Sequence, residues 1–314
     1  MKQLLVYIFA AASLMTSGSS VSAQAATAPG QSMRQIVVDG INRSYIVYLP
    51  KSYSSTVKAP LLFLFHGGGG HASSMLNVSH EGDFKKISER DNVILVAPDG
   101  IDKSWNDGRK TKSNKEGVDD VHFVSQLLQF MEANYAVDAS RIYATGISNG
   151  GFMTSRLGCE LGGKLAAIAV VAASMGVDTP YSSCRPSAPL PVLYIHGTAD
   201  PIVAYNGAAR TIGANGAFVS HQQVLDKWIA LNHCTSIPVV TQLPTIVDDG
   251  TTVSKYYYAP QKDGAEVIGY TIDGGGHTWP GGTQYLPKMI VGPVSHNLNG
   301  CEVIWDFFKQ HTRQ

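Results

Sequence analysis

Short, uninterrupted apolar runs recur along the chain from residue 59 onward. They cover residues 61–65, 93–96, 142–144, 166–171 and 192–195. Strands that are covered on both faces have this pattern, whereas strands with one face in water alternate apolar and polar residues. The runs therefore predict a mostly parallel sheet with helices on both of its faces.

Segments with helical periodicity lie between and after these runs. An apolar stripe recurs at three- and four-residue spacing in residues 121–135, and similar stripes occupy residues 220–231 and the stretch that begins at Cys301. Trp228 and Trp305 fall on the last two stripes, which indicates core positions for both indoles. Strands that alternate with helices predict an α/β fold with a doubly wound sheet.

The N-terminal region has a different pattern. Residues 1–23 combine a basic start, a short apolar run and a small-x-small end, which is typical of a secretory signal peptide cleaved after Ala23. Residues 24–33 are mostly small or polar and predict a flexible leader. Alternating residues in 35–39 and 43–49 predict an antiparallel hairpin at the edge of the sheet.

Composition limits the classes of partner. The chain has 314 residues, of which 44% are hydrophobic, and the part from 34 to 314 is expected to form one domain with a sizeable core. Lys plus Arg (24) equals Asp plus Glu (24), which argues against nucleic acid, since phosphate binding requires a basic face. No segment after the signal peptide is apolar enough to span a bilayer. We expect an extracellular or periplasmic protein that binds no membrane and requires no obligate protein partner.

The sequence Gly146-Ile147-Ser148-Asn149-Gly150 lies between a predicted strand and a predicted helix. A Gly-x-Ser-x-Gly turn in this position is a nucleophile elbow, which lifts a serine hydroxyl clear of the sheet and lets a carbonyl group approach. Ser148 is therefore the candidate nucleophile.

Two further candidates follow predicted strands. Asp200 comes shortly after the strand at 192–195, and His277 lies in a glycine-rich loop after the strand at 267–272. Loops at the carboxyl ends of parallel strands gather at one edge of a sheet. A serine hydroxyl needs a base to take its proton, for which imidazole is suited, and a carboxylate orients that imidazole. The hypothesis assigns Ser148 as nucleophile, His277 as general base and then acid, and Asp200 as the orienting group.

The glycine run at residues 67–70 follows the first long apolar strand. Backbone N–H groups that point at a developing oxyanion lower the cost of its charge, and glycines allow close approach. The expected donors are the N–H groups of Asn149 and of one glycine, with Gly68 preferred over Gly67. The run lacks the pattern of a phosphate-binding loop, the histidines lack zinc-ligand spacing, and we expect neither a cofactor nor a metal.

Other side chains near these loops have candidate roles. His66 and His196 are expected to brace the loops by hydrogen bonding. Trp105 and Trp279 lie in loops at the same sheet edge, where each is a candidate for the wall of a substrate-binding subsite, with core packing as the alternative.

Four cysteines lie in the expected mature chain and would meet an oxidising compartment. Four cysteines allow three pairings. The favoured disulfides are Cys159–Cys184 and Cys234–Cys301.

These motifs resemble those of secreted esterases related to polyhydroxybutyrate depolymerases and feruloyl esterases, the carbohydrate esterase family 1-like branch of the α/β-hydrolases. The resemblance extends from about Arg43 to the last helix, and its carriers are residues 64–70, 105–108, 118–121, 141–151, 196–201 and 275–282. It implies an α/β-hydrolase catalytic domain with a triad of Ser148, Asp200 and His277 and an oxyanion donor at Gly68.

The leading functional hypothesis is a secreted, cofactor-free serine esterase that hydrolyses carboxylic esters through an acyl-enzyme. The ester would be a feruloyl or acetyl group on plant polysaccharide, or a short-chain polyhydroxyalkanoate. The alternatives are a serine peptidase of the prolyl-oligopeptidase type, which shares the triad, and a non-catalytic ligand-binding member of the fold.

Overall fold

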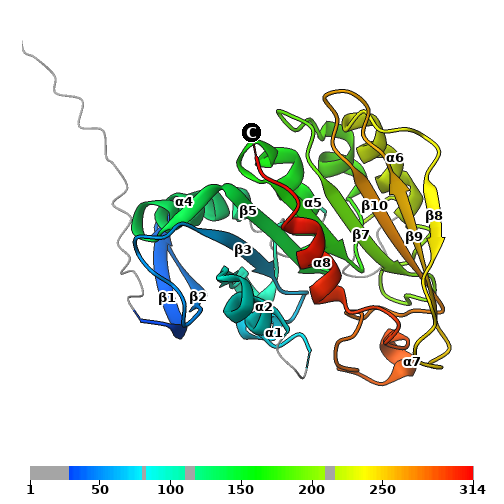
Figure 1. Ribbon diagram of the computed structural model, residues 1–314, viewed down its shortest axis with the longest axis horizontal. Helices are drawn as coiled ribbons and strands as arrows, with labels where there is room; N and C mark the ends of the chain where they lie inside the picture. Colours follow the sequence, from blue (N-terminus) through cyan, green and yellow to red (C-terminus); the bar gives the residue numbers. More distant parts are fainter. Residues whose placement is uncertain (1–27, 80–82, 110–116, 209–215, 314) are drawn as a thin grey trace, which may run out of the picture.

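The computed structural model describes residues 28–79, 83–109, 117–208 and 216–313, so the predicted signal peptide lies outside the described residues. One mixed sheet of 10 strands carries the fold, with helices on both faces (Figure 1). The strands are β1 (Gly30–Val38), β2 (Ile41–Leu49), β3 (Ala59–Phe65), β4 (Ile94–Pro98), β5 (Val137–Ile147), β6 (Ala167–Val171), β7 (Val192–Gly197), β8 (Val239–Gln242), β9 (Thr252–Tyr258) and β10 (Val267–Asp273). The helices are α1 (Ala72–Leu76), α2 (Asp83–Asp91), α4 (Asp120–Asn134), α5 (Asn149–Glu160), α6 (His221–Leu231), α7 (Lys288–Val291) and α8 (Gly300–Phe308), and η1 (Ile101–Lys103), η2 (Gly162–Lys164) and η3 (Val177–Tyr181) are short turns of helix.

The order of strands across the sheet is β1-β2-β4-β3-β5-β6-β7-β10-β9-β8. The central strands from β4 to β10 are parallel, while β1, β2, β8 and β9 pair in antiparallel fashion at the two edges. This arrangement confirms the predicted α/β fold with a mostly parallel sheet and an N-terminal edge hairpin. The five uninterrupted apolar runs of the sequence form strands β3, β4, β5, β6 and β7.

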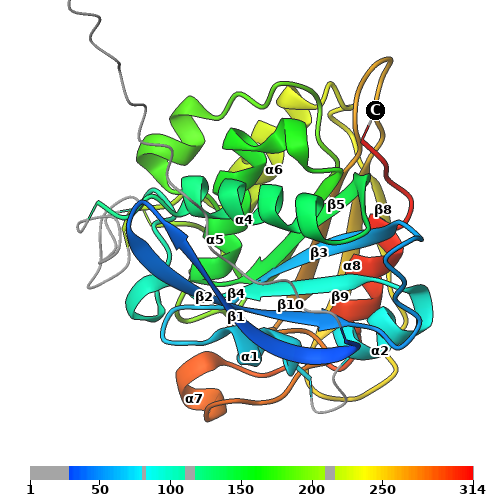
Figure 2. The same cartoon turned by 90° about the vertical axis from the view of Figure 1, so that its left-hand side faces the viewer.

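Two layers of helix enclose the sheet (Figure 2). Helices α4, α5 and α6 cover one face, where Leu127, Phe152 and Trp228 join a single buried cluster. Helices α1, α2 and α8 cover the other face, where the buried cluster includes Phe84 and Phe308. The central strands are thus buried on both sides, which explains why their sequences lack alternation.

The register of the parallel strands sets which loops meet. Phe65 at the end of β3 pairs with Gly146 near the end of β5, so the glycine run and the serine turn leave the sheet side by side. Thr271 in β10 pairs with His196 in β7, which brings the loops after these two strands together.

Several boundaries differ from the expectations. Strand β1 begins at Gly30, within the segment assigned to the leader, because residues 30–33 pair with β2 from Leu49 to Ile46. Strands β8 and β9 were not expected. Most residues of β8 are exposed and β9 is only partly buried, so neither carries the uninterrupted apolar run that marks a covered strand.

A disulfide joins Cys159 to Cys184, the first of the two favoured pairs. The second prediction was wrong, because Cys234 and Cys301 are both free thiols. Cys301 is buried in the cluster under α8, whereas Cys234 packs against the cluster on the opposite face of the sheet. The sheet therefore separates the two thiols. Trp228 and Trp305 are buried on the two faces, as predicted.

Candidate active site

Ser148 occupies the turn between β5 and α5, at the N-cap position of the helix. Its backbone has φ 56° and ψ −127°, a left-handed conformation that is unusual for a residue with a Cβ atom. Two backbone hydrogen bonds hold it: Ser148 N–H donates to the Val171 carbonyl (3.0 Å), and Phe152 N–H donates to the Ser148 carbonyl (2.9 Å). The surrounding sheet and helix thus maintain a strained turn at the candidate nucleophile.

The glycines on either side of Ser148 are required by close packing. A Cβ atom at Gly146 would lie 2.6 Å from the carbonyl oxygen of Gly150. A Cβ atom at Gly150 would overlap the carbonyl oxygens of Phe65 and His66. The Gly-x-Ser-x-Gly spacing therefore reflects a turn that packs against the end of β3, which carries the glycine run.

Asp200 and His277 form a buried pair at the ends of β7 and β10. The Nδ1 atom of His277 lies 2.7 Å from Oδ2 of Asp200, and the two residues are 3% and 6% exposed. The other carboxylate oxygen, Oδ1, accepts hydrogen bonds from the backbone N–H groups of Ile202 and Val203, both at 2.8 Å. Burial by itself would raise the pKa of Asp200, but hydrogen bonds from His196 and His277 outweigh it and lower the pKa to about 2. Asp200 is therefore ionised at neutral pH and can hold the imidazole in one orientation.

The glycine run lies directly beside the serine turn. A Cβ atom at Gly67 would be 3.3 Å from Cβ of Ser148, and one at Gly68 would be 3.8 Å from Cβ of Asn149. The N–H group of Gly69 donates to the Lys103 carbonyl, and that of Gly70 to the Gly67 carbonyl, so both amides are engaged elsewhere. Gly67 and Gly68 remain as the candidate donors of the run.

His66 braces the start of this loop. Its Nε2 atom accepts from Gly100 N–H (3.0 Å), so the ring proton resides on Nδ1, which donates to the Gly67 carbonyl (2.7 Å). Burial lowers the pKa of His66, partly offset by its bond to Gly67. The neutral ring connects two loops through these hydrogen bonds. The predicted bracing role of His66 is thus confirmed.

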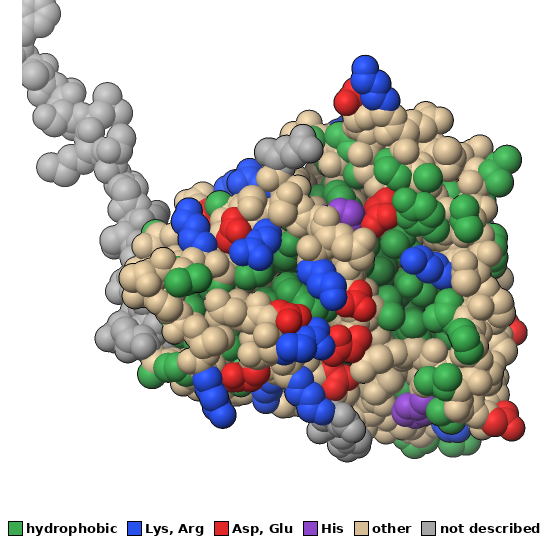
Figure 3. Space-filling model, viewed as in Figure 1, with side chains coloured by type: hydrophobic (Ala, Val, Ile, Leu, Met, Phe, Trp, Pro, Cys, Tyr) green, Lys and Arg blue, Asp and Glu red, His purple; other side chains and the backbone are tan. Residues whose placement is uncertain are grey.

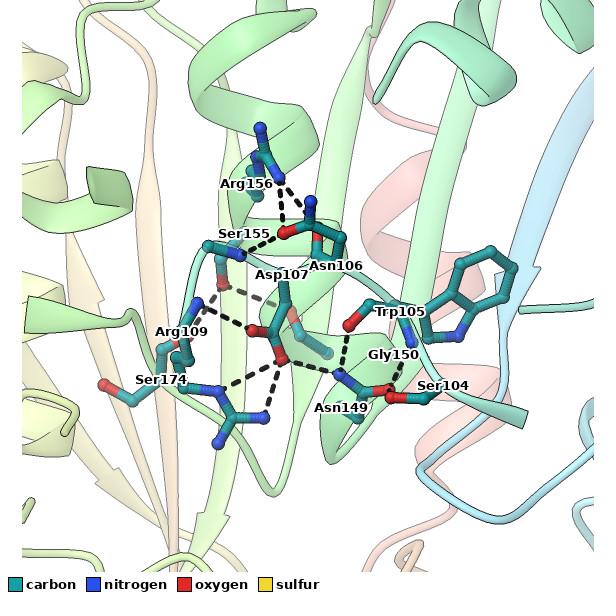
Figure 4. A network of polar contacts seen from close by, with 12 residues as sticks. Ser104, Trp105, Asn106, Asp107, Arg109, Asn149, Gly150, Ser155, Arg156 and Ser174 are labelled. Atoms are coloured by element: carbon teal, nitrogen blue, oxygen red, sulfur yellow. Dashed lines mark hydrogen bonds and ion pairs between the residues drawn. The ribbon is translucent and has the colours of Figure 1, made fainter. Parts of the chain in front are cut away.

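The Asn149 side chain is clamped by the segment 104–107 (Figure 4). Its Oδ1 accepts from the backbone N–H of Trp105 (2.7 Å), while its Nδ2 donates to the Trp105 carbonyl (3.1 Å) and to Oδ2 of Asp107 (2.6 Å). Because Asn149 is the first residue of α5, its backbone N–H lies among those that have no partner within the helix. The clamp therefore orients the peptide that is expected to stabilise an oxyanion.

A buried ion pair anchors this clamp. Oδ2 of Asp107 also accepts from Nη2 (2.6 Å) and Nε (3.1 Å) of Arg109, whose guanidinium lies 3.5 Å from the centre of the Phe152 ring. Asp107 and Arg109 are almost fully buried. A buried charge pair of this kind is costly to break, because removing one partner leaves the other uncompensated.

Sequence reasoning assigned no role to Asp107 or to Tyr285. The available signal for Asp107 was a carboxylate in the Trp-Asn-Asp-Gly motif, whose partner Asn149 is 42 residues away. Tyr285 lies in the segment after His277, and its hydroxyl donates to the His277 carbonyl (3.0 Å). Loop conformation alone determines both contacts.

The burial of Trp105 and Trp279 favours the core-packing alternative over a wall of a substrate-binding subsite. Trp105 is 0% exposed, and its indole N–H donates to the His66 carbonyl at 2.9 Å. Trp279 is 2% exposed and packs edge-on against Phe84. Both indoles therefore pack in the interior, Trp105 against Phe65 and His66 and Trp279 against Phe84.

A separate groove of about 480 Å³ lies over α2 and α8. Acidic and basic side chains are interspersed on this face of the molecule (Figure 3). Within the groove, Arg90 forms ion pairs with Asp91 and Glu302. No cluster of three or more His, Cys, Asp or Glu residues suited to a metal ion occurs within the described residues. None of the helices in the described ranges is long and apolar enough to cross a membrane.

Known proteins share sequence with the segment that carries the candidate nucleophile. Residues 40–161, which include the glycine run and Ser148, match the Esterase family, described as "Putative esterase". The chain is 28% identical over 284 residues to "Putative esterase NocK" of Nocardia uniformis subsp. tsuyamanensis, a match that covers 87% of this chain and 81% of that protein. The chain is therefore similar in sequence to esterases, and the family match covers the segment that holds the glycine run and Ser148.

Two further proteins are similar to this chain, one in sequence and one in structure. The chain is 30% identical over 242 residues to feruloyl esterase B of Piromyces equi, which covers 75% of this chain and 42% of that longer protein. Among solved structures, an acetyl xylan esterase from Aspergillus awamori superposes with a TM-score of 0.57 at 15% identity, covering 79% of this chain and 94% of that one. The structural match supports the α/β-hydrolase fold of this chain.

Proposed function

We propose that the protein is a secreted serine esterase that hydrolyses carboxylic esters through an acyl-enzyme, with Ser148, His277 and Asp200 as its triad. The observation that carries the proposal is the buried His277–Asp200 hydrogen bond, at the same sheet edge as a strained serine turn. The esterase relatives and the glycine run beside Ser148 support it further.

In the proposed reaction, Oγ of Ser148 attacks the ester carbonyl carbon while Nε2 of His277 takes the hydroxyl proton. The negative charge on the carbonyl oxygen is stabilised by the N–H groups of Asn149 and of Gly68 or Gly67. The imidazolium then gives its proton to the leaving alcohol oxygen as the carbon–oxygen bond breaks. Water attacks the acyl-enzyme with the same base, which releases the carboxylic acid and restores the serine.

The ester class is a further part of the proposal. Tyr285, Leu286, Met289 and Ile290, which we call the apolar segment, are all exposed, and Met289 is 90% exposed. The Tyr285 hydroxyl donates a hydrogen bond from this segment to the His277 carbonyl. The side chain of Gln284 donates to the Gly292 carbonyl (3.0 Å), which joins the two ends of the loop that contains the segment. An apolar surface held beside the candidate base favours esters with an apolar group, such as a hydroxycinnamoyl or hydroxyalkanoate ester, over acetyl esters.

Ser148→Ala tests the reaction. Turnover of 4-nitrophenyl butyrate should fall to background in this variant, and a fluorophosphonate should add one covalent group to the wild-type chain but none to the variant, as measured by intact mass. Undiminished turnover by Ser148→Ala would refute the proposal. Wild-type protein that neither turns over esters nor reacts with the fluorophosphonate would favour the non-catalytic alternative, and cleavage of prolyl peptides in preference to esters would favour the peptidase.

Substrate comparison tests the ester class. Methyl ferulate, 4-nitrophenyl acetate, 4-nitrophenyl butyrate and a polyhydroxybutyrate suspension should be compared at matched enzyme concentration. A higher kcat/KM for ferulate or butyrate than for acetate is expected, and Met289→Ser should reduce that preference. A preference for acetate would overturn the assignment of the apolar segment while leaving the esterase proposal intact.

A further inference from the structure

The carboxylate of Asp200 has a second histidine partner. His196, the fifth residue of β7, is 1% exposed, and its Nε2 atom lies 3.3 Å from Oδ2 of Asp200, the same oxygen that His277 contacts. The same Nε2 atom lies 2.8 Å from the Val203 carbonyl oxygen. One imidazole from β7 and one from the loop after β10 therefore converge on one carboxylate oxygen.

The contacts of His196 determine which nitrogen carries its proton. A carbonyl oxygen only accepts, so the contact with Val203 requires the hydrogen on Nε2. The Nδ1 atom is buried and has no hydrogen-bond partner among the described residues. A proton on Nδ1 would create a buried charge with an unsatisfied donor, which is costly. The ring therefore donates through Nε2–H to the Val203 carbonyl, and the same Nε2 atom lies 3.3 Å from Oδ2 of Asp200.

His196 also joins the two ends of the turn that carries the carboxylate. Val203 donates its backbone N–H to Oδ1 of Asp200 and accepts the hydrogen bond of His196 through its carbonyl. The carboxylate, the backbone of residue 203 and the imidazole thus form a closed set of contacts. Movement of Asp200 away from His277 would break several of them together.

We propose that His196 is a positioning residue that holds the Asp200 carboxylate in place for His277 and shares its negative charge. This inference rests on the proposed esterase function. A residue that only fills space in the core would not have this role. The Nε2 atom of His196 lies close to Oδ2 of Asp200, the oxygen that orients the candidate base.

Other titratable groups around this site do not provide the same contact. The ring of His221 in α6 lies 5.6 Å from that of His196 and is stacked on Tyr205 at 4.9 Å. Neither ring nitrogen of His221 has a hydrogen-bond partner in the part of the chain that is described, and burial lowers its pKa well below the usual value. Burial raises the pKa of Tyr205, and burial together with the charge of Asp200 raises that of Tyr285 to about 12, so both phenols stay neutral near neutral pH. His221 is thus a matched control: a buried histidine in the same cluster without a bond to the carboxylate.

The test compares His196→Leu, His196→Gln and His221→Leu by the pH dependence of kcat and kcat/KM on 4-nitrophenyl butyrate. His196→Leu should lower kcat about tenfold, the factor for losing one hydrogen bond to a charged group, with KM within about twofold. With fewer donors on Asp200, the negative charge of the carboxylate is less neutralised and favours a protonated partner, so the acidic limb of kcat/KM should move upward by about half a unit. His196→Gln, whose amide can donate from a similar position, should recover most of both effects, and His221→Leu should leave the profile unchanged.

A low-field proton resonance provides a second measurement that does not depend on turnover. The proton between His277 Nδ1 and Asp200 should shift in His196→Leu and return towards its wild-type position in His196→Gln. An unshifted resonance and an unshifted acidic limb in folded His196→Leu would overturn the inference, as would equal impairment of the Leu and Gln variants at full stability. If Ser148→Ala retained activity, the proposed function itself would fail; loss of activity there with no effect at His196 would refute only the positioning role.

Discussion

Nδ1 of His277 lies 2.7 Å from Oδ2 of Asp200, although 77 residues separate the two in the chain. The parallel pairing of β7 with β10 brings them together, because each residue lies in the loop that follows one of these strands. This contact orients the imidazole, and the proposed chemistry depends on it.

Replacing the carboxylate tests that dependence. Asp200→Asn keeps the size of the side chain, but its amide can favour the wrong tautomer of His277 and cannot stabilise an imidazolium. We expect kcat to fall by about 10³–10⁴-fold. Asp306→Asn, an exposed carboxylate in α8, serves as the control and should retain wild-type activity. A loss of less than tenfold in Asp200→Asn would contradict the assigned role.

The clamp on Asn149 predicts a selective effect on kcat. Asn149→Ala removes the side-chain bonds to Trp105 and Asp107 but keeps the backbone N–H. A less well oriented donor loses more transition-state stabilisation than ground-state stabilisation, so kcat should fall by about tenfold or more with KM little changed. Asn77→Ala, at an exposed asparagine that bonds the Ser73 carbonyl, is the matched control. A rise in KM without a fall in kcat would indicate that the clamp acts in substrate binding instead.

The cysteine arrangement predicts a thiol count. Unfolded but unreduced protein should show two reactive thiols, from Cys234 and Cys301, and reduction should raise the count to the four cysteines of the chain. Cys159→Ser should destabilise the fold by about 3 kcal/mol, because the disulfide closes a loop with a sequence separation of 25. The measurements are titration with a chromogenic disulfide and urea unfolding. A count of zero before reduction would show that the second predicted disulfide forms after all.

The buried, neutral His221 predicts a pH-dependent stability. Burial lowers the pKa of His221 well below the usual value in the folded state, whereas the pKa of this residue in the unfolded chain is about 6.5. The unfolded state therefore binds the extra proton first, and the free energy of unfolding should fall as the pH drops below about 6.5. In His221→Leu this part of the fall should disappear. Unfolding in urea at pH 7.5 and 5.5 measures it, and an unchanged difference between the two pH values would contradict the prediction.

Much of the fold follows from local pattern. Uninterrupted apolar runs predicted β3, β4, β5, β6 and β7, because a strand buried on both faces has no polar side. The Gly-x-Ser-x-Gly turn predicted the position of Ser148, since close packing against β3 admits only glycine on both sides. The loops of Asp200 and His277 followed from strand ends in the same way.

Other features required the tertiary structure. The exposed strand β8 and partly buried β9 lack a clear periodicity, and they form only by pairing beside β10. Trp105 was a candidate for substrate contact, but it is buried. Its burial depends on the packing of its loop against the loop of His66, whose carbonyl accepts the indole N–H. The partners of Asp107 and His196 are set by loop geometry, which no local spacing encodes.

The amino-acid sequence by itself determined where the central strands lie along the chain, where the strained serine turn occurs, and which residue types needed for acyl transfer are present. Only the tertiary structure decided that Cys234 and Cys301 lie on opposite faces of the sheet, that Trp105 and Trp279 are buried, and that two histidines share one carboxylate. The physical reason is that hydrophobic periodicity reports whether a segment is buried, whereas the contacts between distant side chains depend on which segments pack against each other.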